Sequence, residues 1–288
     1  MSRTRARLLP FLALTGALTL AACGGDAQTP AGGSAADTAA GTGASTGGTT
    51  TLKVGVNPVP HGEILEYVAE ELAPEAGLDV EVVEFTDYVQ PNVALDEGAL
   101  DANYFQHQPY LDQQIADAGY EFTALAPVHL EPLGVYSDSL KSLDQLPQGG
   151  TVAIPNDPTN GGRALDLLAA EGVITLADTE GSPTVLDIED NPKDLEFSEV
   201  EAAQLPRSLA DVDAAVINGN YAIEADLSPA EDAIAAESAK GNPYANLLVV
   251  RTEDADDKAL NTLADLLQRP EVADFIEEKY QGAVIPAS

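Results

Sequence analysis

Short apolar runs alternate along the chain with segments in which apolar residues recur every three or four positions. The run at 52–56 predicts a buried strand, and the segment 61–72, with Ile64, Val68 and Leu72 on one face, predicts a helix. Similar patterns predict strands at 79–85, 100–105, 151–154, 195–200, 214–217 and 246–251, and helices at 91–98, 109–118, 162–171, 229–238, 255–268 and 271–280. Strands and helices in this order predict an α/β fold with doubly wound parallel sheets.

The segment 122–136 is a longer extended run that contains Pro127 and Pro132. It is too long for one ordinary strand, so we interpret it as a crossing into a second lobe, with the strand at 246–251 leading back. The predicted lobes are 51–128 with 250–288, and 129–249. Ligands of α/β sheets gather at the carboxyl ends of strands, where the cleft between two such lobes would lie.

The beginning of the chain has the pattern of a secretory leader. Three arginines precede an apolar run at 8–20, which is shorter than the roughly 20 residues of a membrane span. We predict a signal peptide at 1–22, with a retained transmembrane anchor as the alternative. The letters L-A-A-C-G (20–24) resemble the lipobox of bacterial lipoproteins, so Cys23, the single cysteine of the chain, would be diacylated. The protein would then be lipid-anchored on the outer, extracytoplasmic face of the cell membrane.

Residues 24–50 are almost wholly Gly, Ala, Ser and Thr. Such a segment cannot bury enough apolar surface to fold, and its r.m.s. reach in the flexible regime is roughly 30 Å. We therefore interpret 23–50 as the lipidated cysteine and a flexible tether, which leaves 51–288 as the folded body.

The charge of the chain excludes several partners. There are 48 acidic and 13 basic residues, and three of the basic ones lie in the leader, so the mature net charge is about −38. This charge argues against nucleic acid or anionic lipid as a partner of the folded body. A solvated acidic surface explains it, with adaptation to high salt as the alternative.

The stretch 151–168, T-V-A-I-P-N-D-P-T-N-G-G-R-A-L-D-L-L, predicts a strand, a turn and a helix. Arg163 would lie in the first helical turn, where the helix dipole disfavours a cation. A bound anion would explain this position, because free N–H groups at a helix start and a planar guanidinium both suit a carboxylate. The alternative is a local ion pair of Arg163 with Asp157 or Asp166.

Aromatic side chains gather in the first predicted lobe, although the chain has no tryptophan. They are Phe85, Tyr88, Tyr104, Phe105 and Tyr110, which occur near predicted strand ends. Aromatic clusters usually belong to a core, but here Asn103, Gln106, His107 and Gln108 alternate with the rings, and a dry core seldom accepts so many polar groups. A pocket with aromatic walls, facing an arginine across a cleft, suits a zwitterion with an apolar tail.

Five motifs extend this picture along the chain. In order they read F-T-D-Y-V-Q-P-N (85–92), D-A-N-Y-F-Q-H-Q-P-Y-L-D-Q (101–113), P-N-D-P-T-N-G-G-R (155–163), Q-L-P-R-S-L (204–209) and A-V-I-N-G-N-Y-A (215–222). Together they resemble the methionine-binding lipoproteins of the NlpA type, which are substrate-binding proteins of ABC importers. The similarity runs from about residue 52 to 251.

The resemblance implies roles for the aromatic residues. Tyr88, Phe105, His107 and Tyr110 match positions that surround the ligand side chain. A thioether gains roughly 0.3–1.5 kcal/mol from each contact with an aromatic ring, which fits methionine. The alternative for His107 is a strand-end histidine that only orients a neighbour.

It also implies how the amino-acid backbone is held. Arg163 matches the arginine that binds the ligand carboxylate, and Asn218 matches an asparagine that binds the backbone. Asn246, in Y-A-N-L, matches a second one.

A substrate-binding protein of this kind implies a two-lobed, periplasmic-binding-protein-like fold of type II. We expect no enzymatic activity, no cofactor and no metal, a monomer, and partners that are the ABC permease and its ATPase. L-methionine is the expected ligand. Because P-V-P-H-G-E-I-L (58–65) resembles only some branches of the family, D-methionine and a methionine-containing dipeptide are the alternatives.

The histidines and the absence of enzyme motifs bear on two other functions, metal binding and catalysis. His61, His107 and His129 could converge with acidic residues on zinc in a metal-binding importer lipoprotein, although no close histidine pair or histidine-rich loop is present. Otherwise His61 and His129 are interpreted as hinge or loop residues. No nucleophile elbow, P-loop or G-x-G-x-x-G motif after a strand indicates an enzyme. A structural or adhesive lipoprotein would carry no ligand.

Overall fold

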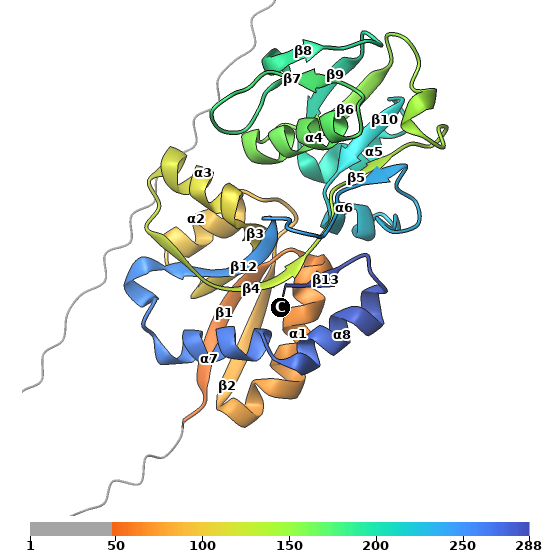
Figure 1. The fold of residues 1–288 in the computed structure, drawn as a ribbon. Coiled ribbons are helices and arrows are strands. Elements are labelled where there is room, and N and C mark those ends of the chain that lie inside the picture. Colours follow the sequence, from red (N-terminus) through yellow and green to blue (C-terminus); the bar gives the residue numbers. More distant parts are fainter. Residues whose placement is uncertain (1–47, 288) are drawn as a thin grey trace, which may run out of the picture. The chain divides into compact units, whose positions relative to one another are not determined.

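Two mixed β-sheets organise the part of the chain that the structure, a computed structural model, describes, which is residues 48–287 (Figure 1). The predicted leader, Cys23 and the tether up to residue 47 lie outside the described residues. The six-stranded sheet has the order β13-β4-β12-β3-β1-β2 and the five-stranded sheet the order β11-β5-β10-β6-β9. Within residues 48–287, no helix combines the length and apolar character needed to cross a membrane.

The six-stranded sheet contains β1 (Thr50–Val56), β2 (Leu78–Glu84), β3 (Ala102–His107), β4 (Phe122–Leu130), β12 (Ala245–Arg251) and β13 (Ile285–Pro286). Strand β1 pairs in parallel with β2 and β3, whereas β12 pairs antiparallel with both β3 and β4. The sheet is therefore mixed, with a parallel part as the sequence predicts and an antiparallel part that the sequence did not predict. The physical reason is that β12 returns from the other sheet and enters this one from the opposite end.

The five-stranded sheet contains β5 (Gly134–Tyr136), β6 (Thr151–Pro155), β9 (Glu196–Val200), β10 (Ala214–Ile217) and β11 (Ala235–Ala236). Strand β6 pairs in parallel with β9 and β10, and β5 pairs antiparallel with β10 and β11. A separate antiparallel pair is formed by β7 (Thr175–Leu176) and β8 (Ile188–Asp190).

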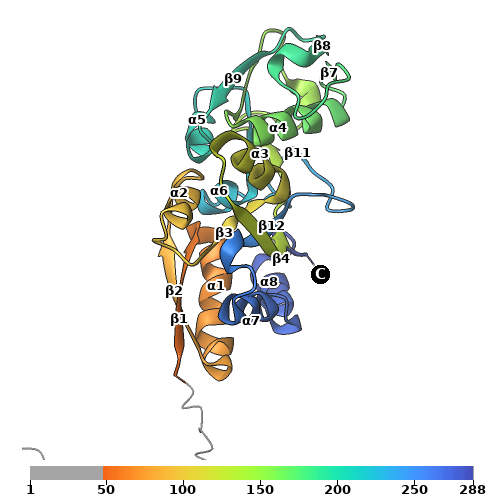
Figure 2. The ribbon, with the colours of Figure 1, turned by 90° about the vertical axis from the view of Figure 1, so that its left-hand side faces the viewer.

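Helices cover both faces of each sheet, as the α/β pattern predicts. They are α1 (Glu63–Tyr67), α2 (Gln90–Asp96), α3 (Gln108–Ala118), α4 (Pro158–Ala170), α5 (Leu205–Ser208), α6 (Gly219–Glu224), α7 (Lys258–Leu267) and α8 (Pro270–Tyr280). In the six-stranded sheet, α1, α7 and α8 pack on one face and α2 and α3 on the other (Figures 1 and 2). In the five-stranded sheet, α4 packs on one face and α5 and α6 on the other.

Two connections join the sheets. Residues 131–133 lead from β4 to β5, and residues 237–244 lead from β11 back to β12. The extended run at 122–136 is thus a crossing, as the sequence predicts, and the two-lobed α/β fold class is confirmed. The lobe boundaries at 128/129 and 249/250 stay a prediction.

The expected helix at 229–238 was wrong. This segment consists of turns followed by β11, because the Ile234 N–H donates to Val135 O (2.8 Å) and the Glu237 N–H to Leu133 O (3.0 Å) at the edge of the sheet. Pairing with a strand that is distant in sequence overrides the local helical pattern. Helix α6, which the sequence did not predict, follows β10 directly.

Candidate functional site

A cavity lies where the loops and strand ends of the two sheets meet. It is a narrow cavity of about 360 Å³, counted with its opening to solvent. Its lining is His61, Tyr88, Phe105, Gln106, His107, Tyr110, Glu131, Asn160, Arg163, Asn218, Gly219, Asn220 and Asn246. The seven residues predicted to contact a ligand are all in this lining, and their role as ligand contacts stays a prediction.

One wall of the cavity is aromatic. The ring centroids of Tyr88, Phe105 and Tyr110 are 6.0–6.1 Å apart in tilted and edge-to-face arrangements. The Tyr110 hydroxyl donates to the backbone oxygen of Tyr88 (3.0 Å), which holds the Tyr110 ring against this segment. Tyr221, which the sequence did not indicate as part of the aromatic cluster, packs against Tyr88 with centroids 5.0 Å apart.

Two of the five clustered aromatic residues belong elsewhere. Tyr104 is fully buried and forms a hydrogen bond with Nδ1 of His129, beyond the lining of the cavity. Phe85 packs in the core below α2, close to Gly55, where an added Cβ would lie 3.1 Å from the ring. The reason is the alternation of a strand, since Tyr104 and Phe105 point to opposite faces of β3.

His107 ends β3 and caps α3. Its Nδ1 accepts the N–H of Tyr110 (3.2 Å), and its Nε2 lies 3.1 Å from Oδ1 of Asn160. Because Nδ1 accepts a backbone N–H, the proton of the neutral ring is on Nε2, which donates to Asn160. Burial, with a smaller effect of the Arg163 charge, lowers the pKa of His107 to about 3. His107 is therefore neutral at physiological pH.

Arg163 lies in the second turn of α4 and not in the first, because the helix begins at Pro158 with Asp157 as its N-cap. Neither local partner predicted for it is used. Its Nε and Nη2 donate to the two carboxylate oxygens of Glu237 (2.7 and 2.5 Å), and Nη2 also donates to Glu131 O (3.0 Å). The guanidinium lies 4.1 Å from the ring centroid of Tyr244, a cation–π contact.

The two predicted asparagines approach the cavity from different sheets. Asn218 precedes α6 and donates from Nδ2 to Oδ1 of Asn160 (3.0 Å), while its own Oδ1 is buried without a hydrogen-bond partner among the described residues. Asn246 is in β12, in register with His107 and His129. The unpaired Asn218 acceptor is the kind of group that a ligand donor can satisfy.

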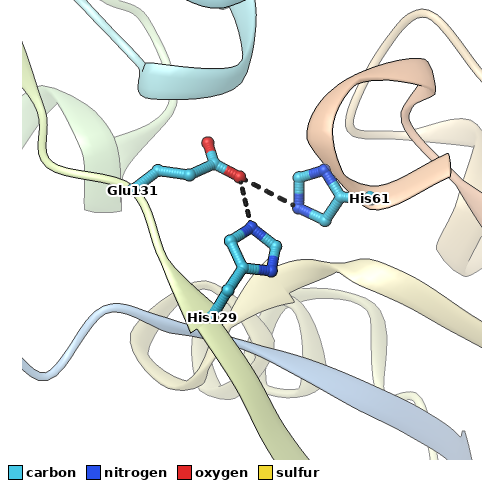
Figure 3. A group of neighbouring side chains, drawn as sticks. All are labelled: His61, His129 and Glu131. Carbon is cyan, nitrogen blue, oxygen red and sulfur yellow. Dashed lines mark hydrogen bonds and ion pairs between the residues drawn. The ribbon is translucent and has the colours of Figure 1, made fainter. Parts of the chain in front are cut away.

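His61, His129 and Glu131 form a buried cluster beside the cavity (Figure 3). Oε1 of Glu131 lies 2.7 Å from Nε2 of His129 and 3.3 Å from Nε2 of His61. Burial lowers the pKa of His61 to about 4 and that of His129 to about 3, and it raises the pKa of Glu131. Their ligand atoms lie within 4.8 Å of one another, so the cluster could hold a metal ion.

This cluster corrects two expectations. His107 is not part of it, because its Nε2 is bonded to Asn160 in the other lobe, so the three histidines do not converge. His129 is neither a hinge nor a loop residue, since it lies within β4.

Hydrogen bonds at the cavity connect residues that follow strands of the six-stranded sheet with residues that follow strands of the five-stranded sheet. The Tyr88 hydroxyl donates to Oδ1 of Asn220 (2.5 Å), and the Tyr221 hydroxyl donates to Thr86 O (3.2 Å). With the bond between His107 and Asn160, these contacts hold the two sides of the narrow cavity together.

The whole folded body matches one family model, that of the NlpA lipoproteins, over residues 52–288. The chain belongs to the NlpA lipoprotein family. It is 43% identical over 277 residues to the D-methionine-binding lipoprotein MetQ of Salmonella typhimurium, with 95% of this chain and 94% of that protein covered. The protein of the same name from Escherichia coli is 42% identical over 276 residues, with the same coverage.

A solved relative has the same fold. The nutrient binding protein from Burkholderia cenocepacia, solved bound to methionine, superposes with a TM-score of 0.80 at 49% identity, covering 82% of this chain and 100% of that one. Membership of the NlpA family confirms the expectation of a substrate-binding transport protein and not an enzyme.

Six lining residues of this NlpA protein were not among the predicted ligand contacts: His61, Gln106, Glu131, Asn160, Gly219 and Asn220. From the sequence, His61 was interpreted only as a possible metal ligand or a hinge or loop residue, and Gln106 only as a polar neighbour of the aromatic rings. Gln106, Asn160, Gly219 and Asn220 lie inside the five motifs, so the motif letters themselves were the available signal. Glu131 had another signal, since it is a charged residue between Leu130 and Pro132 in an extended apolar run. Gly219 is needed because an added Cβ would lie 2.6 Å from Cβ of Glu131.

Proposed function

We propose that this chain is the extracytoplasmic substrate-binding lipoprotein of an ABC importer and that it captures methionine, with L-methionine as the ligand. The supporting observation is one cavity that is lined both by a guanidinium, Arg163, and by an aromatic wall of Tyr88, Phe105 and Tyr110. Such a cavity can hold a carboxylate at one end and an apolar thioether at the other. The names of the MetQ relatives and the methionine-bound neighbour support the same ligand class.

The guanidinium has a donor for the ligand carboxylate. The hydrogen bonds of Arg163 to the described residues come from Nε and Nη2, which leaves Nη1 for the ligand. A charge-assisted hydrogen bond of this kind contributes about 1.5–3 kcal/mol. Burial of a methionine-sized side chain adds about 1.5–3 kcal/mol, and each contact of the thioether with an aromatic ring adds about 0.3–1.5 kcal/mol.

Binding would proceed by closure of the two lobes. The cavity is narrow and is lined by residues of both sheets, so the ligand would enter when the two sides move apart at the connections 131–133 and 237–244. Closure then completes contacts from both sides, and the permease recognises the closed form. The partner ATPase supplies the energy for transport.

We further propose that Cys23 carries the lipid that anchors the protein on the outer face of the cell membrane, and that the protein acts as a monomer. The L-A-A-C-G sequence and the tether support the anchor. The names of the MetQ relatives as lipoproteins agree with it.

Native mass spectrometry of protein purified without refolding, followed by calorimetry, tests the ligand. We expect a retained mass of methionine or a calorimetric Kd for L-methionine in the micromolar range or below. D-methionine and glycyl-methionine are titrated in parallel, and tighter binding of either would reassign the ligand within the same class. L-norleucine, which replaces sulfur by a methylene, should bind more weakly by a few-fold to about tenfold. No binding of any methionine compound would refute the proposed function.

A further inference from the structure

Glu131 is a buried carboxylate in the wall of the cavity, with a side chain only 7% exposed. In the described part of the chain, the titratable basic groups within 4 Å of its carboxylate are two histidines, His61 and His129. The carboxylate thus lies inside the protein, next to a ligand cavity. Burial of a carboxylate is costly unless a cation or several donors contact it, so a ligand that brings a cation would fit this position.

We propose that Glu131 binds the ammonium group of the ligand and is the residue that selects α-amino acids over carboxylic acids that lack the amino group. This inference rests on the proposed function. The first support is the acceptor chemistry of the wall. Oε1 of Glu131 faces Nε2 of His61, whose ring nitrogens have no hydrogen-bond partner in residues 48–287, and the unpaired Oδ1 of Asn218 lines the same cavity. An ammonium has three N–H donors and needs several acceptors.

The second support is the contact between Arg163 and the backbone of Glu131. Nη2 of Arg163 donates to the backbone oxygen of Glu131 (3.0 Å), so the guanidinium and the Glu131 residue are immediate neighbours. The ammonium and the carboxylate of an α-amino acid are attached to the same carbon and therefore also lie side by side. A zwitterionic head group can thus place its carboxylate at Arg163 and its ammonium at Glu131 without turning the side chain away from the aromatic wall.

The third support is that Glu131 is held in place. Nε2 of His129 lies 2.7 Å from its Oε1, and Nδ1 of the same ring is bonded to the Tyr104 hydroxyl, which fixes the ring. Gly219 lies directly against the Glu131 side chain, because an added Cβ would come within 2.6 Å of its Cβ. His129 is a positioning residue in this arrangement, whereas Glu131 would touch the ligand. A carboxylate held in this way is already oriented before the ligand arrives.

Burial raises the pKa of Glu131, and His61, a backbone hydrogen bond from Asn220 and the charge of Arg163 act in the opposite direction. An ammonium in contact with the carboxylate would act in the same direction as Arg163 and would favour the ionised form. The ligand would therefore complete the charge balance of the cluster on binding.

The test compares two ligands on two proteins by calorimetry. The ligands are L-methionine and 4-(methylthio)butanoate, which has the same thioether and carboxylate but no ammonium. The wild type should prefer methionine by at least about tenfold, and Glu131→Gln should weaken methionine binding by about 10- to 100-fold while the analogue changes less than about threefold. Equal losses for both ligands, or a wild type that binds the analogue as tightly as methionine, would overturn the proposal. A wild type that binds neither ligand refutes the proposed function instead.

Glu237→Gln is the matched control, because Glu237 is a second acid near the site that contacts Arg163 at the carboxylate end. It should change the affinities for both ligands by the same factor. If Glu131→Gln does not fold, as judged by circular dichroism, Glu131→Asp replaces it, with a smaller loss expected for methionine alone.

Zinc is titrated into the same proteins, since the cluster also has the donors of a metal site. The expected result is no zinc binding by the wild type at micromolar concentrations. Zinc binding that Glu131→Gln abolishes, together with an unchanged preference for methionine over the analogue, would overturn the ammonium role and assign the cluster to a metal.

Discussion

Arg163 and Glu237 form a two-point ion pair, in which Nε and Nη2 of the guanidinium donate to the two carboxylate oxygens at 2.7 and 2.5 Å. The residues are 74 positions apart in sequence, and their side chains are only 5% and 11% exposed. Asn242 and the backbone N–H of Leu133 also donate to Glu237. The pair thus fixes the direction of Arg163 toward the cavity.

Substitution of Arg163 by alanine should remove nearly all methionine binding, a loss of about 100-fold or more in Kd by calorimetry. The reason is that charge-assisted hydrogen bonds to the carboxylate are lost in a buried cavity. The double variant Arg163→Ala with Glu237→Gln controls for the acid left unpaired in the single variant. Near-normal affinity in either variant would contradict the carboxylate role.

A double-mutant cycle in urea unfolding measures how much the interaction of Arg163 with Glu237 contributes to the free energy of unfolding. Each single variant, Arg163→Ala and Glu237→Ala, should lower the free energy of unfolding by about 3–5 kcal/mol, because it leaves one buried charge without its partner. The double variant should lose clearly less than the sum. Strictly additive losses would show that the two residues do not depend on each other.

Removal of the Tyr88 hydroxyl tests the contact across the cavity. Tyr88→Phe keeps the ring but loses the 2.5 Å hydrogen bond to Asn220, so the closed form loses about 1 kcal/mol and methionine should bind about three- to tenfold more weakly. Tyr120→Phe is the control, since Tyr120 stacks on Phe122 away from the cavity. If both variants bind methionine like the wild type, the bond does not contribute to closure.

Stability should fall in acid, and His107 contributes to the fall. Burial lowers the pKa of folded His107 to about 3, whereas the unfolded chain has the ordinary value near 6.5. Above about pH 6.5, His107 is neutral in both states and does not lower the free energy of unfolding. As the pH falls from about 6.5 toward 3, the unfolded chain takes up a proton at His107 that the folded protein does not, so the free energy of unfolding falls by up to about 1.4 kcal/mol per pH unit.

His107→Asn measures this contribution. Asparagine keeps an acceptor for the N–H of Tyr110 but does not titrate. In urea unfolding between pH 4 and 7, the free energy of unfolding should depend less steeply on pH in the variant than in the wild type. The difference in slope should correspond to at most one proton taken up on unfolding. Because Glu131 and the other histidines are common to both proteins, their titration cancels, and parallel curves would contradict the pKa shift.

Lipid attachment at Cys23 can be tested in cells. The full chain should incorporate labelled fatty acid and fractionate with membranes, because L-A-A-C-G matches a lipobox. Cys23→Ala should do neither. Labelling of the variant at the wild-type level would rule out Cys23 as the acylated residue.

Local patterns were sufficient for much of the fold. The strands at 52–56, 151–154 and 214–217 and the helices at 109–118 and 271–280 lie within a few residues of the observed β1, β6, β10, α3 and α8. Each of them has a regular apolar period and a clear boundary, such as Gly119 after α3, so the pattern and the local geometry agree. The prediction of a helix at 229–238 failed because its alanines fit a helix as well as a strand, and pairing of β11 with β5 determined the conformation.

The sequence by itself determined the α/β class, the crossing between lobes and, through its family resemblance, seven of the residues that line one cavity. These features depend on local periodicity and on letters that stand close together. Only the tertiary structure decided that Arg163 pairs with Glu237, that β12 runs antiparallel beside β3, and that His61, His129 and Glu131 meet. The sequence shows which side chains are charged and require a partner when they are buried. The tertiary packing of segments that lie tens of residues apart determines which partner each side chain contacts.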